Sequence, residues 1–473
     1  MSTNPALPAR SMFATTVMEG YAPRAAHLEG TIPDWLRGDL VRTAPALFAH
    51  GGWAAAHWFD AVGMLYRFSV KSPTEVTWAQ RLLECDAARH ALAGRVPVSS
   101  FGTPNGRPWW KRVVQPIPQV SDNTNVNVLK LGPDWVAMTE TATQYMVDPE
   151  TLSTRGAVRY DDALGDELAM LAHPHFDFAR GKAVNVASKL GVQAELVVFE
   201  HDPAERRRVE VGRWKGKEMP YVHSFALTAT KAVLIDHPLR VRPASMLWSN
   251  KGYIDHFRWD GAGPTRLIVI DRAGGPNRVL ETDGMFVFHT VNAFDDGDGL
   301  VMDVLAYPDA SIVDALRVER LTTERLDLRA SLVRLRLDLA SKTVRREVLL
   351  DDGFEFPSVS YRKVSGRRHG AVWGARLGDA GEGMRSTLVR VDPERGEVAR
   401  YSDGDVVYGE PVFVARPGAT DEDDGVLLAV GSSPSAGRSH LAVLRAQDLE
   451  RIATASVETP LPLGFHGSFA RAV

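Results

Sequence analysis

The sequence predicts a large all-β fold, and three observations support this prediction. Short apolar segments, many of them rich in β-branched residues, recur along almost the entire chain. Gly, Asp, Asn or Pro bounds most of these segments, and stretches with a helical pattern are few. The clearest strand-like segments are residues 135–140, 194–202, 231–238, 266–271, 299–307, 332–339 and 425–431. Many short antiparallel strands over 473 residues fit either a β-propeller or a pair of β-sandwiches.

The organisation of the chain favours one large domain. No Pro-, Ser- or Gly-rich linker interrupts it, so we expect a poorly ordered segment over residues 1–20 and a single domain over residues 21–473. Short helices are predicted only within residues 160–172 and 311–330. No repeat of 40 to 50 residues is visible, so the residues alone do not give a blade count.

The composition excludes several classes of protein. Hydrophobic residues make up 44% of the chain and charged residues 24%, which is typical of a soluble globular protein. The net charge of −4 lacks the basic surplus of nucleic-acid-binding proteins. The single cysteine, Cys85, can form neither an intrachain disulfide nor a cysteine-based zinc site. Neither a signal-peptide core nor a membrane-spanning segment is present, so we expect a cytoplasmic protein whose membrane contact, if any, is peripheral.

The histidines carry the strongest chemical signal. His223, His289 and His466 each lie in an apolar, strand-like segment next to aromatic residues. A buried imidazole must find a polar partner, and a metal ion is one such partner. His173 and His175 both lie in the segment Ala-His-Pro-His-Phe, and their residue types do not decide which of them would bind a metal. The spacings match no local metal motif such as HExxH, so the local contexts carry this interpretation.

These segments resemble the four iron-ligand segments of the carotenoid cleavage oxygenase family. The matching motifs are Ala-His-Pro at 172–174, His-Ser-Phe at 223–225, Phe-His at 288–289 and Gly-Phe-His-Gly at 464–467. The resemblance extends to GTIPDWLRGDL at 30–40 and His-Trp-Phe-Asp at 57–60, and therefore covers the chain from about residue 29 to its end. The sequence departs from the family pattern at 42–46, where Arg-Thr-Ala-Pro-Ala replaces Arg-Asn-Gly-Pro-Gly, and at Ala61, where the family has Gly.

The resemblance implies a fold and a metal site. The fold is a seven-bladed β-propeller with iron on its axis and a cap of loops and short helices over the active site. One Fe²⁺ per chain would be bound by His173 (rather than His175), His223, His289 and His466. Three glutamates match the family positions that hydrogen-bond the ligand imidazoles, an arrangement that fixes the imidazole tautomer and raises its basicity. They are Glu140, Glu355 and Glu410, each of which would otherwise be read as a surface residue.

The implied activity is that of a non-haem iron(II) dioxygenase. With O₂ it would cleave one conjugated C=C bond of a carotenoid or apocarotenoid into two carbonyl products, such as retinal or a related apocarotenal. Stilbene-cleaving relatives typically carry Lys where this chain has Thr139, so the sequence favours a polyene substrate. A stilbene or phenylpropanoid cleavage dioxygenase is the nearest alternative, and a retinoid isomerohydrolase-like activity is another. A non-catalytic β-propeller used for binding is the alternative of a different class, but it would not require these four histidines.

An apolar substrate requires an apolar tunnel and access to a membrane. Val126 matches the family position above the vacant site of the iron, whereas three aromatic residues flank the ligands; core packing is the alternative interpretation of all four. The tunnel candidates are Val126, Phe225, Phe286 and Phe288. Tryptophans next to basic residues suit an interfacial anchor, with burial as the alternative. The predicted membrane contacts are Trp109, Trp110, Met246, Leu247 and Trp248.

Overall fold

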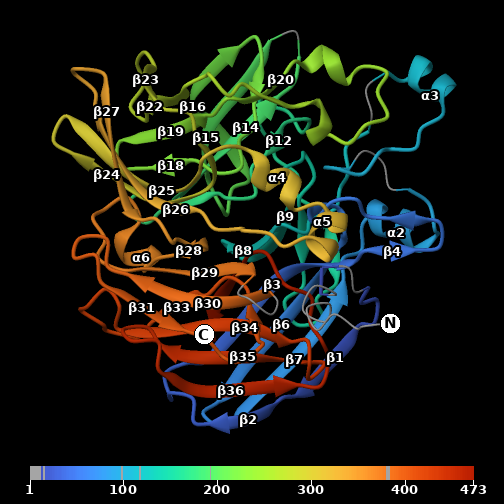
Figure 1. Ribbon diagram of the computed structural model, residues 1–473, viewed down its shortest axis with the longest axis vertical. Helices are drawn as coiled ribbons and strands as arrows, with labels where there is room; N and C mark the ends of the chain where they lie inside the picture. Colours follow the sequence, from blue (N-terminus) through green and yellow to red (C-terminus); the bar gives the residue numbers. More distant parts are fainter. Residues whose placement is uncertain are drawn as a thin grey trace.

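The computed structural model describes residues 12–13, 16–96, 100–116, 119–191, 193–379 and 384–472. Within these residues, seven antiparallel sheets of four to six strands form the blades of a β-propeller (Figure 1). The prediction of a seven-bladed all-β propeller is confirmed, and the pair of β-sandwiches is excluded. All seven strand-like segments identified in the sequence form strands.

The first four blades follow one another along the chain. The first blade contains β1 (Tyr21–Ala25), β7 (Glu75–Leu82), β6 (Val62–Ser72), β3 (Gly38–Leu47) and β37 (Gly467–Arg471). The second contains β11 (Thr154–Ala157), β10 (Tyr145–Val147), β9 (Asp134–Met138) and β8 (Asn127–Leu131). The third contains β12 (Ala169–Met170), β13 (His175–Asp177), β14 (Lys182–Lys189), β15 (Ala194–Asp202) and β16 (Arg207–Gly216). The fourth contains β18 (Ala226–Leu227), β19 (Lys231–Asp236), β22 (Thr265–Asp271) and β23 (Arg278–Thr282).

The last three blades complete the ring. The fifth contains β24 (Phe286–Asp296), β25 (Gly299–Tyr307), β26 (Ser331–Asp338) and β27 (Thr343–Leu350). The sixth contains β28 (Glu355–Ser358), β29 (Val372–Asp379), β30 (Met384–Val391) and β31 (Val398–Tyr401). The seventh contains β32 (Val407–Tyr408), β33 (Val412–Ala415), β34 (Gly425–Ser433), β35 (Arg438–Arg445), β36 (Arg451–Val457) and β2 (His27–Gly30).

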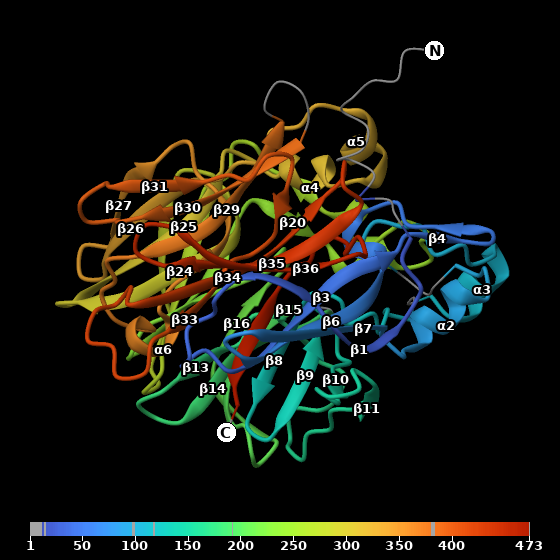
Figure 2. The same cartoon turned by 90° about the horizontal axis from the view of Figure 1, so that it is seen from below.

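The two ends of the chain close the ring of blades. The C-terminal β37 pairs antiparallel with β3, with Leu40 opposite Phe469. The N-terminal β2 pairs with β36, with Leu28 opposite Ala455. In Figure 2 the blue first blade and the red seventh blade accordingly lie side by side. The first and last blades are therefore held together by backbone hydrogen bonds as well as by side-chain packing.

Burial falls from the middle of each blade to its outer edge. All residues of β3 except Asp39 are buried, because neighbouring blades cover both faces of the sheet. The outer strand β27 has no buried residue, and exposed and half-buried side chains alternate little along it, since only part of one face meets a neighbour. This gradient puts the apolar core between the blades and leaves polar groups near the axis to be satisfied by one another.

Short insertions form a cap next to the propeller. The helices of the cap are α2 (Asp86–Leu92), α3 (Trp109–Val114), α4 (Ser311–Ala315) and α5 (Val318–Thr323), with the 3₁₀ helices η1 (Trp58–Asp60), η2 (Pro243–Met246) and η3 (Ile254–His256). Two small sheets accompany them: β4 (Ala49–His50) with β5 (Trp53–Ala54), and β17 (Met219–Pro220) with β20 (Leu239–Val241) and β21 (Arg258–Trp259). Helix α6 (Tyr361–Val364) lies apart from the cap, beside β13 (Figure 2). Helix α3 projects away from the blades in both views (Figures 1 and 2). No helix among the described residues is long and apolar enough to cross a bilayer.

Two local expectations differ from the structure. The helices expected within residues 311–330 are present as α4 and α5, but residues 160–172 form turns and the two-residue strand β12. Asp162 accepts hydrogen bonds from the backbone and guanidinium of Arg208, and Gly165 adopts a positive φ of 87°, so the segment cannot continue as a helix.

The N-terminal segment is partly packed against the protein. Residues 1–11, 14 and 15 lie outside the described residues, so the expectation of poor order is not addressed there. Phe13 is fully buried and its ring lies 5.3 Å from that of Trp58, while the backbone N–H of Val17 donates to Ala46. The described part of this segment therefore contacts β3 and η1.

Candidate metal centre

Four histidines from four different blades converge at the centre of the propeller. They are His173 of the third blade, His223 of the fourth, His289 of the fifth and His466, which directly precedes β37 of the first. Their potential ligand atoms all lie within 4.8 Å of one another. His289 lies where the register between β24 and β25 shifts, and such a bulge re-aims a side chain that a regular strand would direct elsewhere.

The spacing of the imidazoles fits a single metal ion. The Nε2 atoms of His173 and His223 are 3.0 Å apart, those of His223 and His289 3.3 Å, and those of His289 and His466 3.2 Å. With metal–nitrogen bonds of about 2.0–2.1 Å, as in zinc–imidazole sites, neighbouring ligands of a tetrahedral or octahedral ion would be roughly 2.9–3.4 Å apart. The observed separations fall within that range.

Three glutamates determine which nitrogen of each imidazole faces the centre. Nδ1–H of His223 donates to Glu140, that of His289 donates to Glu355, and that of His466 donates to Glu410 at 2.8 Å. Nε2 of each ring therefore carries a lone pair and no proton. Lone pairs held about 3 Å apart repel one another unless a cation lies between them. The donor set thus fits a metal ion with open coordination positions.

Burial keeps the imidazoles of His173 and His466 in the neutral form that binds metals. Desolvation, followed by the proximity of the other three histidines, holds the pKa of His173 well below its ordinary value. Burial lowers the pKa of His466 to about 4, although Glu410 opposes this shift. Burial alone would raise the pKa of Glu355. The nearby His289 and the hydrogen bonds that the Glu355 carboxylate accepts outweigh burial, so the pKa is lowered overall.

Reciprocal side-chain bonds connect two of the histidine-bearing segments. The Ser224 hydroxyl donates to the carbonyl of Phe288 at 2.7 Å and accepts from the N–H of Thr290 at 3.0 Å. The Thr290 hydroxyl donates to the carbonyl of Phe225 at 2.8 Å. The residues on either side of His289 are thereby fixed to the two residues that follow His223.

His175 lies outside the cluster and has a different set of partners. Its Nε2–H donates to the carbonyl of Phe225 at 2.9 Å, and its Nδ1 accepts from the Tyr361 hydroxyl at 2.9 Å. The Tyr361 oxygen in turn accepts from the N–H of Phe176 at 3.0 Å. Both ring nitrogens of His175 are occupied, so the structure brings His173 into the cluster and leaves His175 as a link between β13 and α6.

A large cavity opens from the metal centre. Its volume is about 730 Å³, and His223, His289 and His466 lie on its wall. Most of the lining is apolar and comes from the axis and from the cap: Trp58, Phe59, Phe101, Val126, Met246, Leu247, Phe288, Ile312, Leu316, Leu328, Phe356, Leu377 and Phe465. Phe356 adopts a positive φ of 56°, a strained conformation for a non-glycine residue that is typical of functional sites.

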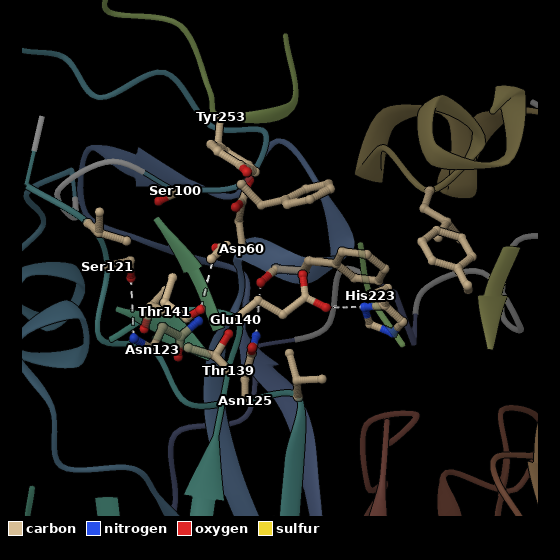
Figure 3. A pocket seen from close by; sticks show the side chains of 18 of the residues that line it. Asp60, Ser100, Ser121, Asn123, Asn125, Thr139, Glu140, Thr141, His223 and Tyr253 are labelled. Carbon is tan, nitrogen blue, oxygen red and sulfur yellow. Dashed lines mark hydrogen bonds and ion pairs between the residues drawn. The ribbon is translucent and has the colours of Figure 1, made fainter. Parts of the chain in front are cut away.

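One wall of the cavity is polar. Figure 3 shows Ser100, Thr139, Thr141 and Tyr253 around the part of the pocket beside Glu140. The Thr141 hydroxyl is buried, and no described residue forms a hydrogen bond with it. An unpartnered buried hydroxyl is costly, and a ligand oxygen would remove that cost. The cavity therefore suits an apolar ligand that carries an oxygen atom.

Comparison with known proteins agrees with the fold and the site. The family model described as retinal pigment epithelial membrane protein matches residues 13–471. The chain belongs to this family.

Three known proteins are similar to this chain over nearly its full length. Human β,β-carotene 15,15'-dioxygenase is 28% identical over 523 residues, which cover 97% of this chain and 94% of the relative. The carotenoid isomerooxygenase of Galleria mellonella is 28% identical over 484 residues, covering 94% and 93%. Cobalt-substituted Synechocystis apocarotenoid oxygenase shares the fold with a TM-score of 0.87 at 24% identity, covering 98% of this chain and 99% of the other.

The four aromatic and aliphatic tunnel candidates have different locations in this family member. Val126 and Phe288 line the cavity. Phe225 and Phe286 do not line it, which contradicts their assignment to the tunnel. Phe225 packs its ring against His175, and Phe286 packs between His237 and Phe288, so both are core residues.

The predicted membrane residues gather on one side of the molecule. Trp109, Trp110 and Trp248 are exposed, and Met246 and Leu247 line the cavity. The guanidinium of Arg112 on α3 donates to the carbonyl of Trp248, which joins the two segments.

Several residues of the site were not identified from the sequence. Tyr307 donates to Glu355 at 3.0 Å, and Arg42 contacts Glu410. Arg42 could have been noticed, because it is the single charged residue in the apolar run from Leu40 to Leu47. Tyr307 had no such signal, since a tyrosine at the end of an apolar strand is common.

Proposed function

We propose that this protein is a non-haem iron(II) dioxygenase that cleaves one conjugated C=C bond of an apocarotenoid or carotenoid with O₂, giving two carbonyl products. The observation that carries this proposal is the four-histidine cluster on the wall of an apolar cavity of about 730 Å³. The carotenoid-cleaving activities named for the relatives agree with it. We assign the metal-binding role to His173, His223, His289 and His466, and the orienting role to Glu140, Glu355 and Glu410.

The donor set supports the choice of iron. Neutral imidazoles suit iron among several first-row metals, and four of them leave coordination positions open. Bound iron(II) would supply the activation of O₂, which no side chain of the protein can perform. The glutamates accept the Nδ1 protons and thereby keep each Nε2 directed to the centre.

The protein's own residues would position the substrate. Phe288, Phe356 and Phe465 bring aromatic surface next to the imidazoles and exclude water from the reacting double bond. Val126 narrows the same part of the cavity. The hydroxyls of Thr141 and Tyr253 are available to an oxygen at one end of the substrate, which favours an apocarotenal or apocarotenol over a hydrocarbon carotene.

The substrate class can be tested directly. The iron(II)-loaded protein is incubated in air with β-carotene, several apocarotenals and resveratrol, and the aldehydes are identified by chromatography and mass. We expect an aldehyde pair from an apocarotenal, whose masses locate the cleaved bond. Cleavage of resveratrol alone would assign the enzyme to the stilbenes, and a wild-type protein that binds no iron would contradict the proposal.

The route of the substrate from a membrane is a second part of the proposal. Trp109, Val113, Val114 and Trp248 expose apolar side chains beside Lys111 and Arg112, a combination that suits a bilayer interface. The exposed Val120 lines the cavity, as do Met246 and Leu247, which directly precede Trp248 in the sequence. We infer a peripheral membrane contact here, through which a polyene would enter the cavity.

A further inference from the structure

Arg42 on β3 is a cation buried beside the metal centre. Its side chain has no solvent exposure. Nη1 donates to the backbone carbonyl of Glu410 at 2.7 Å, and Nη2 donates to that of Phe465 at 2.6 Å. Nη1 also lies 3.5 Å from the Glu410 carboxylate, which accepts the Nδ1 proton of His466. A buried guanidinium needs such partners, because an unpaired buried charge is strongly destabilising.

The three glutamates of the centre differ in their other partners. Glu355 accepts from the Tyr307 hydroxyl at 3.0 Å and from the Phe356 N–H at 3.1 Å, and both donors are neutral. Glu140 lines the cavity, as Glu355 also does. Among the described residues, Glu410 is the only one of the three that lies within ion-pair distance of an arginine or lysine.

The formal charges around the centre balance. An imidazole that binds a metal ion is neutral, and the three glutamates bonded to the imidazoles carry three formal negative charges. A divalent ion and Arg42 together carry three positive charges. Asp60 also faces the cavity, but its carboxylate is bonded to Gly102 and Thr103, and among the described residues it is bonded neither to the four histidines nor to the three glutamates.

We propose that Arg42 is a positioning residue that completes the charge balance of the centre and thereby favours iron(II) over iron(III). This inference rests on the proposed metal-binding function. A shell of net charge −2, made of three carboxylates and one guanidinium, neutralises a divalent ion. Without Arg42 the shell would carry −3, which neutralises a trivalent ion instead. Arg42 thus keeps the iron in the oxidation state in which it meets O₂.

The test compares the balance of oxidised and reduced iron in four variants and the wild type. Iron-loaded proteins are titrated with redox mediators, and the Fe(III)/Fe(II) ratio is read from spectra at a fixed potential. Arg42→Gln should raise this ratio on the order of tenfold, the effect of one nearby unit charge at an effective dielectric constant of about 20. Glu410→Gln should lower it by a similar factor. Arg42→Lys, which keeps the charge, should leave it close to the wild-type value.

The double variant Arg42→Gln/Glu410→Gln decides between charge and structure. It restores the charge balance and should return the Fe(III)/Fe(II) ratio to within about threefold of the wild type, because the two unit charges cancel. If Arg42 only held the backbone, Lys and Gln would be equally damaging and the double variant would not recover. An unchanged ratio in Arg42→Gln, or in Glu410→Gln should Arg42→Gln not fold, would overturn the inference. A wild-type protein that binds no iron would instead overturn the proposed function, and it would do so before any variant is compared.

Discussion

The metal centre and the surface around α3 differ in which groups they bury. Polar groups are buried at the centre, whereas apolar side chains are exposed around α3. At the centre, imidazoles and carboxylates are buried, and each carboxylate is hydrogen-bonded to an imidazole. Around α3, Trp109 is 70% exposed and Val114 is 78% exposed. The cavity connects the two regions, since its lining runs from His466 to Leu247.

This difference indicates how stability and function are divided. Removing one member of a buried hydrogen-bonded pair leaves the other unsatisfied, so substitutions at the centre should affect both metal binding and folding. Removing an exposed tryptophan leaves nothing unsatisfied, so substitutions around α3 should affect only what binds there. The following predictions test this division, from the largest expected effect to the smallest.

The largest effect is expected from removing one imidazole. His289→Ala deletes a donor that faces both His223 and His466, so bound iron should fall below about one tenth of the wild-type content, with loss of cleavage activity. Metal analysis of the purified protein measures the content. His256→Ala is the matched control, because His256 lines the same cavity but lies outside the cluster. Equal iron content in both variants would contradict the assignment of the site.

A smaller effect is expected from the glutamates, and it should differ between them. Glu355→Gln and Glu140→Gln each remove the negative charge of a carboxylate that is bonded to an imidazole, which should weaken metal binding by roughly 10–100-fold. The loss should be larger for Glu355, because Glu355 is buried and Glu140 is partly solvated at the cavity wall. Competition with a chelator measures the affinities. Glu167→Gln, at the exposed end of the cavity lining, should leave the metal affinity unchanged. A loss of affinity in Glu167→Gln equal to that in Glu355→Gln would contradict the orienting role of Glu355.

Asp60 lies between the two regions and should make stability depend on pH. Burial raises its pKa from 3.8 to about 6, although the bonds from Thr103 and Gly102 oppose the shift. A raised folded-state pKa means that the stabilising contribution is fully present below the unfolded pKa and is lost as pH rises through the folded pKa.

Stability of the wild type relative to Asp60→Asn should therefore fall between pH 4 and pH 6, by about 3 kcal/mol at most. Asparagine cannot lose a proton and should remove this dependence. Urea denaturation of both proteins at several pH values measures the difference. A constant difference across that range would show that Asp60 does not titrate there.

The sequence predicted the regular parts of this molecule well, for identifiable reasons. Segments such as 194–202 and 299–307 are strands to the residue, because Gly, Asp or Pro fixes their ends. The histidines were recognisable because each lies in a short apolar segment of distinct composition. The resemblance to a family, and not spacing, selected His173 over His175, since the partners of His175 come from residues 225 and 361.

Features that depend on long-range packing could not be predicted. Phe225 and Phe288 both flank a ligand in sequence, but only Phe288 faces the cavity, because the strand geometry of each blade directs them differently. Arg42 joins the centre through Glu410, which is 368 residues away. Only the closure of the ring brings β3 and the seventh blade together, so no local pattern carries this contact.

The smallest effect on the folded protein, and the most selective one, is expected around α3. Trp109→Ser/Trp110→Ser should leave iron content and melting temperature unchanged, because both rings are exposed. It should weaken co-sedimentation with liposomes on the order of tenfold, since tryptophan rings beside Lys111 and Arg112 would insert at the headgroup level. The control Val209→Ser/Val348→Ser removes two exposed apolar side chains from the outer strands β16 and β27 and should leave liposome binding intact. Equal binding by both double variants would mean that exposure around α3 has no more affinity for a bilayer than exposure elsewhere. The assignment of the metal centre would then stand, but the proposed entry of the substrate from a membrane around α3 would not.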